Sequence, residues 1–223
     1  MSFLIRILIP DAPGSLGRLA EAIGAVGGNI KSVDIVETFH DRSVLDDIVV
    51  ELPSDIMADT LITAASSIDG VVVDSIRPFS GRVDRRGQIQ MLSNVASHAN
   101  DLKRAMQELV NVIPQAMTVS WAIVLDDTGK DTKISRVAAA QAAPEDDGSN
   151  PTTIDVTKAR ILNPETEEWI PASWGLLDSS LAVTPLNGTG MVLVVGRTGG
   201  PDFLASEVDH LGHVGQIVGS ILT

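Results

Sequence analysis

The 223-residue sequence contains no cysteine. Disulfide bonds, thiol nucleophiles and thiolate metal ligands are therefore excluded. Small secreted domains commonly rely on disulfides for stability, so the absence of cysteine favours a cytoplasmic location. The absence of cysteine thus excludes enzymes with a cysteine nucleophile and metal sites with thiolate ligands.

Long apolar runs are also missing, although 44% of the residues are hydrophobic. No stretch approaches the roughly 20 uninterrupted apolar residues that cross a bilayer. The opening residues, MSFLIRILIPDAPG, do not read as a basic leader followed by a long apolar run and a cleavage site. We expect a cytoplasmic protein without membrane contact, with enough apolar material for the cores of two ordinary domains.

Basic and aromatic residues are scarce. The net charge is −13, and residues 1–80 hold 5 Lys and Arg against 12 Asp and Glu. The rest of the chain is acidic as well, and the sequence offers three Trp, four Phe and no Tyr. Nucleic-acid binding normally uses clustered cations and stacking side chains, so we do not expect DNA or RNA as a partner.

The first 80 residues alternate between strand and helix patterns. Strands are expected at residues 3–9, 29–39, 44–52 and 70–76. Apolar residues at three- and four-residue steps predict a helix that ends at Gly27-Gly28. A second helix should open after Pro53, with Ser54 as its N-cap. The order βαββαβ predicts a ferredoxin-like domain over residues 1–80, with both helices on one face of an antiparallel sheet.

A second α+β domain is expected over residues 91–223, after a linker at 81–90. Apolar residues from Leu92 to Ile113 recur at alternating steps of three and four, which predicts one long helix closed by Pro114. A closing helix at 204–222 keeps the same spacing. Between these helices the strand-like segments are residues 118–125, 133–140, 180–185 and 191–197.

Two short motifs in the first domain carry a resemblance. An Asp-x-Pro-Gly-x-Leu loop lies at residues 11–16, and a Gly-x-Asn-Ile motif follows at residues 27–30. Together with the βαββαβ order they make residues 3–79 resemble the ACT family of amino-acid-sensing regulatory domains. The resemblance implies a small-molecule ligand, an amino acid, bound between two ACT domains. The contacts that it implies are Asp11, Ala12, Pro13, Gly14, Leu16, Asn29 and Ile30.

The residues of these motifs can be interpreted either as a ligand site or in purely structural terms. The N–H groups at the start of a helix can receive a carboxylate, and Asn29 can both donate and accept. Alternatively, Asp11 caps the helix or the turn, Pro13-Gly14 only shapes the bend, and Asn29 adopts a left-handed conformation after Gly28.

The second domain resembles the GAF family of ligand-sensing domains at its end. The strand at 191–197, the loop Gly199-Gly200-Pro201-Asp202-Phe203 and the helix at 205–222 carry this resemblance. It implies an antiparallel sheet flanked by the first and last helices. Residues 126–178 depart from the pattern, because a long loop stands where strands and ligand-lining positions would be.

Other combinations of polar residues point only weakly to chemistry. His210 and His213 are near Glu207 and Asp209, but a solvated helix face explains them better than a metal site. Neighbouring Asp46 and Asp47 should point to opposite faces of their strand, as should Asp126 and Asp127. The sequence therefore predicts no catalytic residue, no metal and no cofactor.

We expect a regulatory sensor that forms a homodimer and is not an enzyme. One alternative is an ACT-regulated enzyme with its active site in the second domain, which would need to gather Asp126, Asp127, Lys130, Lys158, Glu165 and Glu167. The other is a structural adaptor that regulates a partner enzyme.

Overall fold

The computed structural model describes residues 1–79, 85–127, 134–146, 148 and 154–223. The chain divides into two compact units, Met1–Val83 and Asp84–Thr223. Each unit has its own antiparallel sheet and helices, so the chain is α+β, as the sequence predicts.

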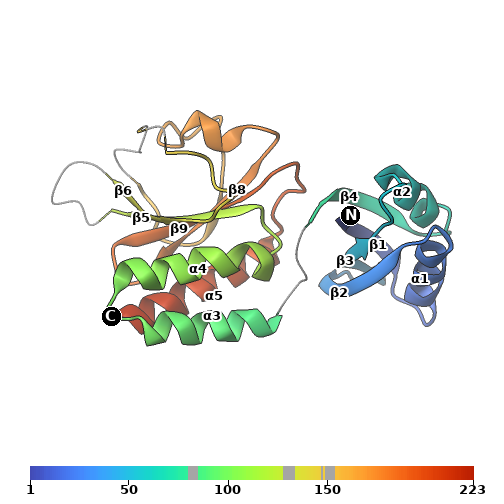
Figure 1. Cartoon of the computed structure of the whole chain (residues 1–223), viewed down its shortest axis with the longest axis horizontal. Helices are drawn as coiled ribbons and strands as arrows, with labels where there is room; N and C mark the ends of the chain where they lie inside the picture. Colours follow the sequence, from blue (N-terminus) through green and yellow to red (C-terminus); the bar gives the residue numbers. More distant parts are fainter. Residues whose placement is uncertain (80–84, 128–133, 147, 149–153) are drawn as a thin grey trace. The chain divides into compact units, whose positions relative to one another are not determined.

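The N-terminal unit has six elements in the order βαββαβ. Four strands form its sheet in the order β2-β3-β1-β4, with every neighbouring pair antiparallel. Both helices lie on one face of this sheet (Figure 1). The elements are β1 (Ser2–Pro10), α1 (Ser15–Ala25), β2 (Asn29–Thr38), β3 (Ser43–Glu51), α2 (Ala58–Ser66) and β4 (Val72–Pro78). Their order is the one that the apolar pattern predicts.

Alternating side chains of β1 and β3 build the core beneath the helices. Ile5 of β1 lies opposite Ile48 of β3, and both are buried with Leu19 and Ile23 of α1. A Cβ atom on Gly28 would lie 2.6 Å from Ile23 Cγ2, so glycine lets the chain pass close to α1 as it enters β2. This packing fixes α1 against the sheet.

Helix α2 begins later than the sequence suggests. Ser54 was expected to cap it, but the N-cap position is Met57, and Ser54 lies in a turn before it. Ile56 packs against the core within that turn. Ile56 therefore belongs to the turn before α2 and not to the apolar face of the helix.

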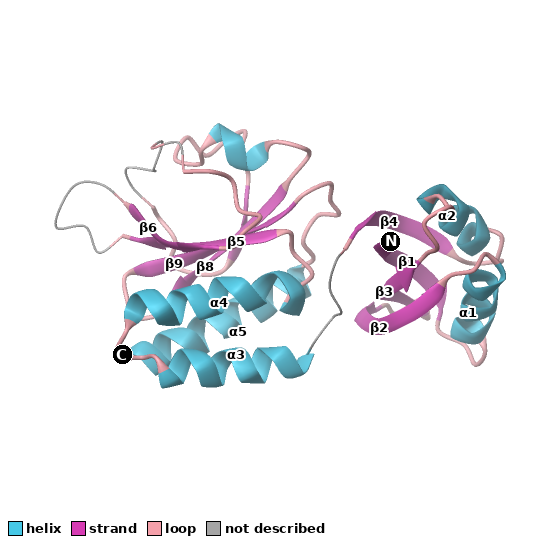
Figure 2. Ribbon diagram, viewed as in Figure 1, coloured by secondary structure: helices cyan, strands magenta, loops and turns pink. Residues whose placement is uncertain are grey.

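The C-terminal unit contains a five-stranded sheet with three α-helices on one side (Figure 2). The strand order is β6-β5-β9-β8-β7, and all neighbours are antiparallel. The short helix at residues 172–175 lies on the other side of the sheet (Figure 2). The elements are α3 (Arg85–Ser97), α4 (Leu102–Ala116), β5 (Trp121–Asp126), β6 (Ser135–Ala139), β7 (Arg160–Leu162), the 3-10 helix η1 (Ala172–Gly175), β8 (Ser180–Leu186), β9 (Met191–Arg197) and α5 (Ala205–Leu222).

The sequence predicts a single helix from Leu92 to Ile113. This prediction is wrong, because the structure has two helices there. The chain turns between α3 and α4, and Asp101 caps α4 by accepting a hydrogen bond from Arg104 N at 3.2 Å. Pro114 lies inside α4 and does not end it. Helix α3 also begins at Arg85, inside the segment expected to be a linker, of which residues 81–84 lie outside the described residues.

Glycine in α5 permits close contact with the β8–β9 hairpin. A Cβ atom on Gly215 would lie 2.4 Å from the Pro185 carbonyl oxygen. Helix propensity alone favours Gly215→Ala by about 1 kcal/mol. We expect the opposite sign, a loss of roughly 1–3 kcal/mol, because backbone must move to admit the methyl group.

The control is Gly24→Ala in α1, where the added Cβ meets no atom within 4 Å. It should gain about 0.5–1 kcal/mol. All three Trp lie in the C-terminal unit, so urea unfolding followed by fluorescence reports Gly215→Ala, and circular dichroism reports Gly24→Ala. A stabilised Gly215→Ala variant would contradict the close packing of α5.

Candidate functional site

The Pro-Gly bend lies between β1 and α1 and is open to solvent. Asp11, Ala12, Pro13 and Gly14 are all exposed. Asp11 N donates to the Arg42 carbonyl oxygen at 2.7 Å, which ties the bend to the turn between β2 and β3. Gly14 has a φ of 89°, a left-handed conformation that glycine adopts without strain. We call residues 11–14 the β1–α1 loop.

The N-terminus of α1 has no capping side chain. Its N-cap residue is Gly14, and its first turn contains no acidic residue. Ser15 N donates to Ala12 O and Arg18 N to Gly14 O, whereas the N–H groups of Leu16 and Gly17 have no acceptor among the described residues. Asp11 thus does not cap the helix. The free N–H groups and the positive end of the helix dipole favour an anion at this point.

Asn29 lies at the opposite end of the sheet from the β1–α1 loop. It pairs with Glu51, which pairs with Ser2, whereas Pro10 at the other end of β1 pairs with Ser43. Eight residues of β3 separate these two ends, which corresponds to about 26 Å. Within one chain the structure therefore does not bring the loop and Asn29 together.

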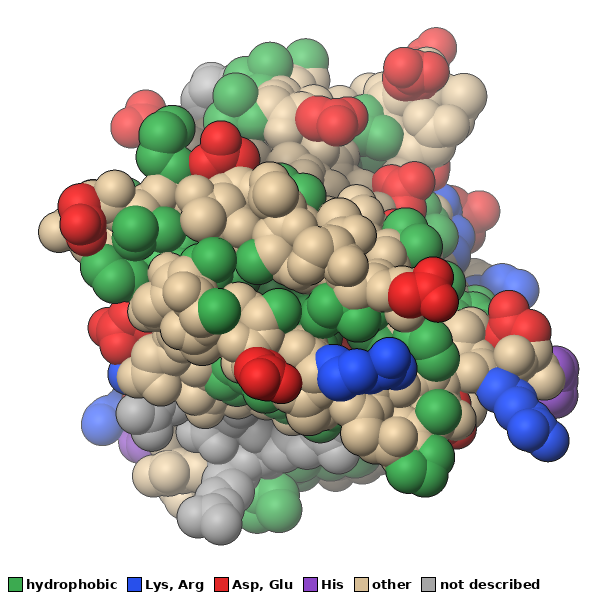
Figure 3. Space-filling model, turned by 90° about the vertical axis from the view of Figure 1, so that its right-hand side faces the viewer, with side chains coloured by type: hydrophobic (Ala, Val, Ile, Leu, Met, Phe, Trp, Pro, Cys, Tyr) green, Lys and Arg blue, Asp and Glu red, His purple; other side chains and the backbone are tan. Residues whose placement is uncertain are grey.

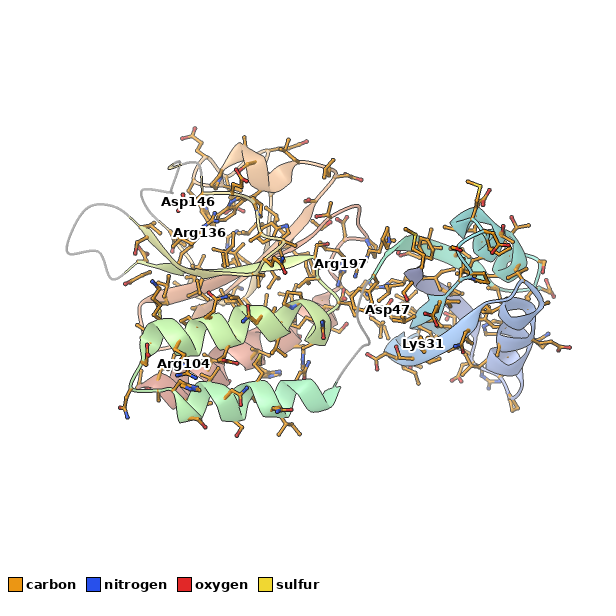
Figure 4. The ribbon with its side chains drawn as sticks, in the orientation of Figure 1. Lys31, Asp47, Arg104, Arg136, Asp146 and Arg197 are labelled. Atoms are coloured by element: carbon orange, nitrogen blue, oxygen red, sulfur yellow. The ribbon has the colours of Figure 1, made fainter. Side chains whose placement is uncertain are left out.

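Asn29 is exposed and begins β2, and it is not among the described residues with positive φ. The alternative in which Asn29 adopts a left-handed backbone conformation is therefore wrong. Lys31 of β2 forms an ion pair with Glu51 (Figure 4). This pair lowers the pKa of Glu51, and a hydrogen bond from the Asn29 side chain adds to the effect. Ile30 is half-buried and packs against the core.

Asp46 is a buried carboxylate on β3 that the sequence pattern does not mark as a site residue. It is 2% exposed, and Oδ1 has no hydrogen-bond partner among the described residues. In the register it lies opposite Ile7 of β1 and Ile35 of β2. Since Ile7 belongs to the core under the helices, Asp46 is on the helix-covered face. Burial, and then repulsion by Asp47, Asp34 and Asp11, raises its pKa from 3.8 to about 6.

Asp47 points to the other face, as strand alternation predicts. Arg6 donates two hydrogen bonds to it, from Nε to Oδ1 at 2.7 Å and from Nη2 to Oδ2 at 2.9 Å. Such a bidentate pair satisfies both carboxylate oxygens. Of the two adjacent carboxylates, Asp47 has a cationic partner and Asp46 has none within the described part of the chain.

The surface over α1 and α2 offers no clustered cations. On the face shown in Figure 3, which carries these helices, Lys and Arg side chains stand apart from one another among Asp and Glu side chains. A free anion would find little support there from side chains, so the backbone N–H groups of α1 are the stronger attraction for a carboxylate.

In the C-terminal unit, the carboxylate Glu167 is fully engaged in the structure. Arg160 donates to both of its oxygens, at 2.8 and 2.7 Å, and Asn163 N and Trp169 Nε1 donate as well. These bonds, the Arg160 pair first, lower the pKa of Glu167 to about 2. Glu167 therefore holds the loop after β7 together and is not available as an acid or base.

The other titratable residues expected for an enzyme are mostly on the surface of the described part of the chain. Asp127, Lys158 and Glu165 are exposed, and Asp126 is half-buried. Lys130 lies outside the described residues. Arg136 and Asp146 are on the side of the sheet away from the helices (Figure 4), where Arg136 Nη1 donates to Pro144 O at 2.7 Å.

A cavity of about 220 Å³ lies at the end of the β8–β9 hairpin. Its walls come from the hairpin, from Asp127 and from the segment at 154–157, which follows residues that the structure does not describe. The lining residues are Asp127, Ile154, Val156, Thr157, Pro185, Leu186, Asn187, Gly188, Gly190, Met191 and Val192.

The acidic residue in the first turn of the closing helix α5, Glu207, has a structural role. Arg197 donates from Nη2 to Glu207 Oε1 at 2.7 Å, and Leu204 N donates to Glu207 Oε2 at 2.9 Å. His210 Nε2 lies 3.1 Å from Gln88 Nε2. Across the described ranges, no three His, Asp or Glu side chains come together in a way that could hold a metal ion. The helices of those same ranges are too short or too polar to span a bilayer.

No protein-family model matches this chain, and no curated protein does. Solved structures are similar to it in part. The GAF domain of an Acinetobacter phosphoenolpyruvate-protein phosphotransferase is 15% identical, with a TM-score of 0.43, and the match covers 60% of this chain and 92% of that one. Free methionine-R-sulfoxide reductase from Neisseria meningitidis, in complex with its substrate, is 14% identical with a TM-score of 0.44, covering 65% and 95%.

The A. aeolicus nlh2 GAF domain in an inactive state is 11% identical, with a TM-score of 0.43, and the match covers 61% of this chain and 96% of that one. None of these three structures is described as an ACT domain. At these identities and TM-scores the likenesses assign no role to any residue of this chain.

The raised pKa of Asp46 makes the stability of the N-terminal unit depend on pH. Because folded Asp46 binds its proton more tightly than the unfolded chain does, lowering the pH from about 7 to about 4 should stabilise this unit relative to Asp46→Asn. A pKa raised from 3.8 to about 6 corresponds to roughly 3 kcal/mol at most.

Urea unfolding at several pH values, followed by circular dichroism, measures this difference. Fluorescence of the Trp residues, all in the C-terminal unit, is the internal control and should be the same in both proteins. If the free energies of unfolding of wild type and Asp46→Asn changed with pH in parallel, Asp46 would not be a buried, unpaired carboxylate.

Proposed function

We propose that this protein is a regulatory sensor that binds a small molecule and does not catalyse a reaction. In this proposal the N-terminal unit is a ferredoxin-like ACT domain that binds an amino acid, and the C-terminal unit is a GAF-like sensory or dimerisation module. The observation that carries the proposal is the uncapped start of α1 behind an exposed Pro-Gly bend, which presents free N–H donors to a carboxylate.

If both motifs contact one ligand, the separation of the loop from Asn29 requires a site formed by two copies of the chain. A two-fold axis across the strands reverses their direction, so that the loop end of one copy meets the Asn29 end of the other. The strand nearest such an axis is β2, an edge strand whose Val33 and Ile35 are 40% and 60% exposed. Each ligand would then touch Asp11, Ala12, Pro13, Gly14 and Leu16 of one copy, and Asn29 and Ile30 of the other.

The binding step should stabilise the protein by mass action. Each of the twenty amino acids at about 10 mM is added to the full-length protein, and unfolding is followed by scanning calorimetry. We expect one amino acid, or a small group of similar ones, to raise the transition of the N-terminal unit. If none does, the ACT part of the proposal is wrong.

Two variants test the contacts. Leu16→Glu places a carboxylate in the first turn of α1, where it suits the helix dipole and competes with a ligand carboxylate. Asn29→Ala removes the amide. Each should weaken binding by about 10-fold or more, the usual loss for a hydrogen bond to a charged group. Met57→Glu, which adds the same charge at the start of α2, is the matched control and should bind normally.

Mixing the two variants tests whether the site is shared. In a dimer of one Leu16→Glu chain and one Asn29→Ala chain, one site carries both changes and the other carries neither. Random exchange should restore tight binding to about one quarter of the sites, measured by calorimetric titration. No recovery on mixing would show that both residues serve the ligand from the same chain, or not at all.

A further inference from the structure

Asp46 of β3 and the first turn of α1 are at the same level of the N-terminal unit. Ile23 is close to Val50, since a Cβ on Gly28 would touch both, at 2.6 and 3.0 Å. Eight residues back along α1 is Ser15, about 12 Å away, and four residues back along β3 is Asp46, about 13 Å away. Both elements run in the same direction, antiparallel to β1, so Ser15 and Asp46 are at the same level.

Two further observations place Asp46 at this end of the unit. Helix α1 lies against β1 and β2, the two strands that flank β3. The charge of Asp11, in the β1–α1 loop, contributes to the raised pKa of Asp46. The buried Asp46 side chain and the free N–H groups of Leu16 and Gly17 therefore belong to the same end of the N-terminal unit.

The surroundings of Asp46 change from core to open edge across the sheet. Ile7 on one side is fully buried, whereas Ile35 on the other side is 60% exposed. Asp46 is thus one strand away from a solvent-exposed edge. A route to this carboxylate from solvent therefore comes from the β2 side and not through the apolar core.

A buried carboxylate without a partner destabilises the folded protein, and such residues gather at functional sites. The packing of the core gives no reason for a charge at this position, since its neighbours Val44 and Ile48 on the same face of β3 are apolar. A cationic group of a ligand would supply the missing partner. Asp11, which also acts on Asp46 electrostatically, adds to the attraction for a cation.

We propose that Asp46 binds the ammonium group of the ligand while the N–H groups of Leu16 and Gly17 bind its carboxylate. The site then recognises a free α-amino acid as a zwitterion and discriminates against molecules that lack either charge. This inference rests on the proposed amino-acid-binding function, and it adds a residue that the ACT-like motifs do not contain. Asp46 contributes from the same chain as the loop.

The test compares three probes on full-length protein by calorimetric titration. They are the amino acid with the largest effect in the calorimetric screen, its 2-hydroxy acid, which lacks the ammonium group, and its primary amine, which lacks the carboxylate. Wild type should bind the amino acid at least about 30-fold more tightly than either analogue, because each analogue leaves a buried polar group unpaired.

The Asp46→Asn variant should bind the amino acid and the 2-hydroxy acid with affinities within a few-fold of each other, while it still rejects the amine. A merely structural role of Asp46 would weaken all probes together and leave their ratio unchanged. Asp55→Asn is the matched control: Asp55 is exposed in the turn before α2, and its substitution removes the same charge. It should keep the wild-type ratio.

The outcomes separate the two proposals. If no amino acid binds wild type, the proposed function fails and the role of Asp46 fails with it. If an amino acid binds wild type and Asp46→Asn retains the full preference for it over the 2-hydroxy acid, only the role of Asp46 is overturned. Circular dichroism spectra that match the wild-type spectrum at the titration temperature show that the variants are folded.

Discussion

The alternation of side chains along β3 decides what the N-terminal unit can do. Two adjacent carboxylates are sent to opposite faces of the sheet, and their surroundings differ completely. Asp47 meets the guanidinium of Arg6 and has both oxygens satisfied. Asp46 lies between Ile7 and Ile35 on the helix-covered face, with no cationic partner in the described part of the chain. The same chemical group is a structural anchor on one face and an unsatisfied charge on the other.

The periodic parts of the sequence predicted the structure well. The βαββαβ order, the positions of β8 and β9 and the opposite orientation of Asp46 and Asp47 all follow from the two-residue and 3.6-residue repeats of strands and helices. The prediction was poorer where a single polar residue ends or begins a helix although the apolar repeat continues past it. Asp101 caps α4 and breaks a heptad pattern that continues across the turn, so that Leu102 is 43% exposed.

The candidate site was predictable only in part, because motifs describe loops and do not describe tertiary neighbours. The Pro-Gly bend and Gly14 lie where the sequence places them. The distance from the bend to Asn29 depends on strand order, which two motifs 11 or more residues apart along the chain do not reveal. Asp46 resembles any acidic residue of a strand until the register shows Ile7 beside it, on the helix-covered face of the sheet. Its signal in the sequence is a charge on the apolar side of an otherwise buried strand.

The distance between the two ends of the first sheet has a thermodynamic consequence for the proposed shared site. An amino acid measures only a few ångströms, so one molecule cannot reach both the bend and Asn29 of a single chain. In a shared site, ligand occupancy and self-association become linked equilibria, and each strengthens the other. The response would then depend on how abundant the protein is as well as on the nutrient level, and dilution alone would release the ligand.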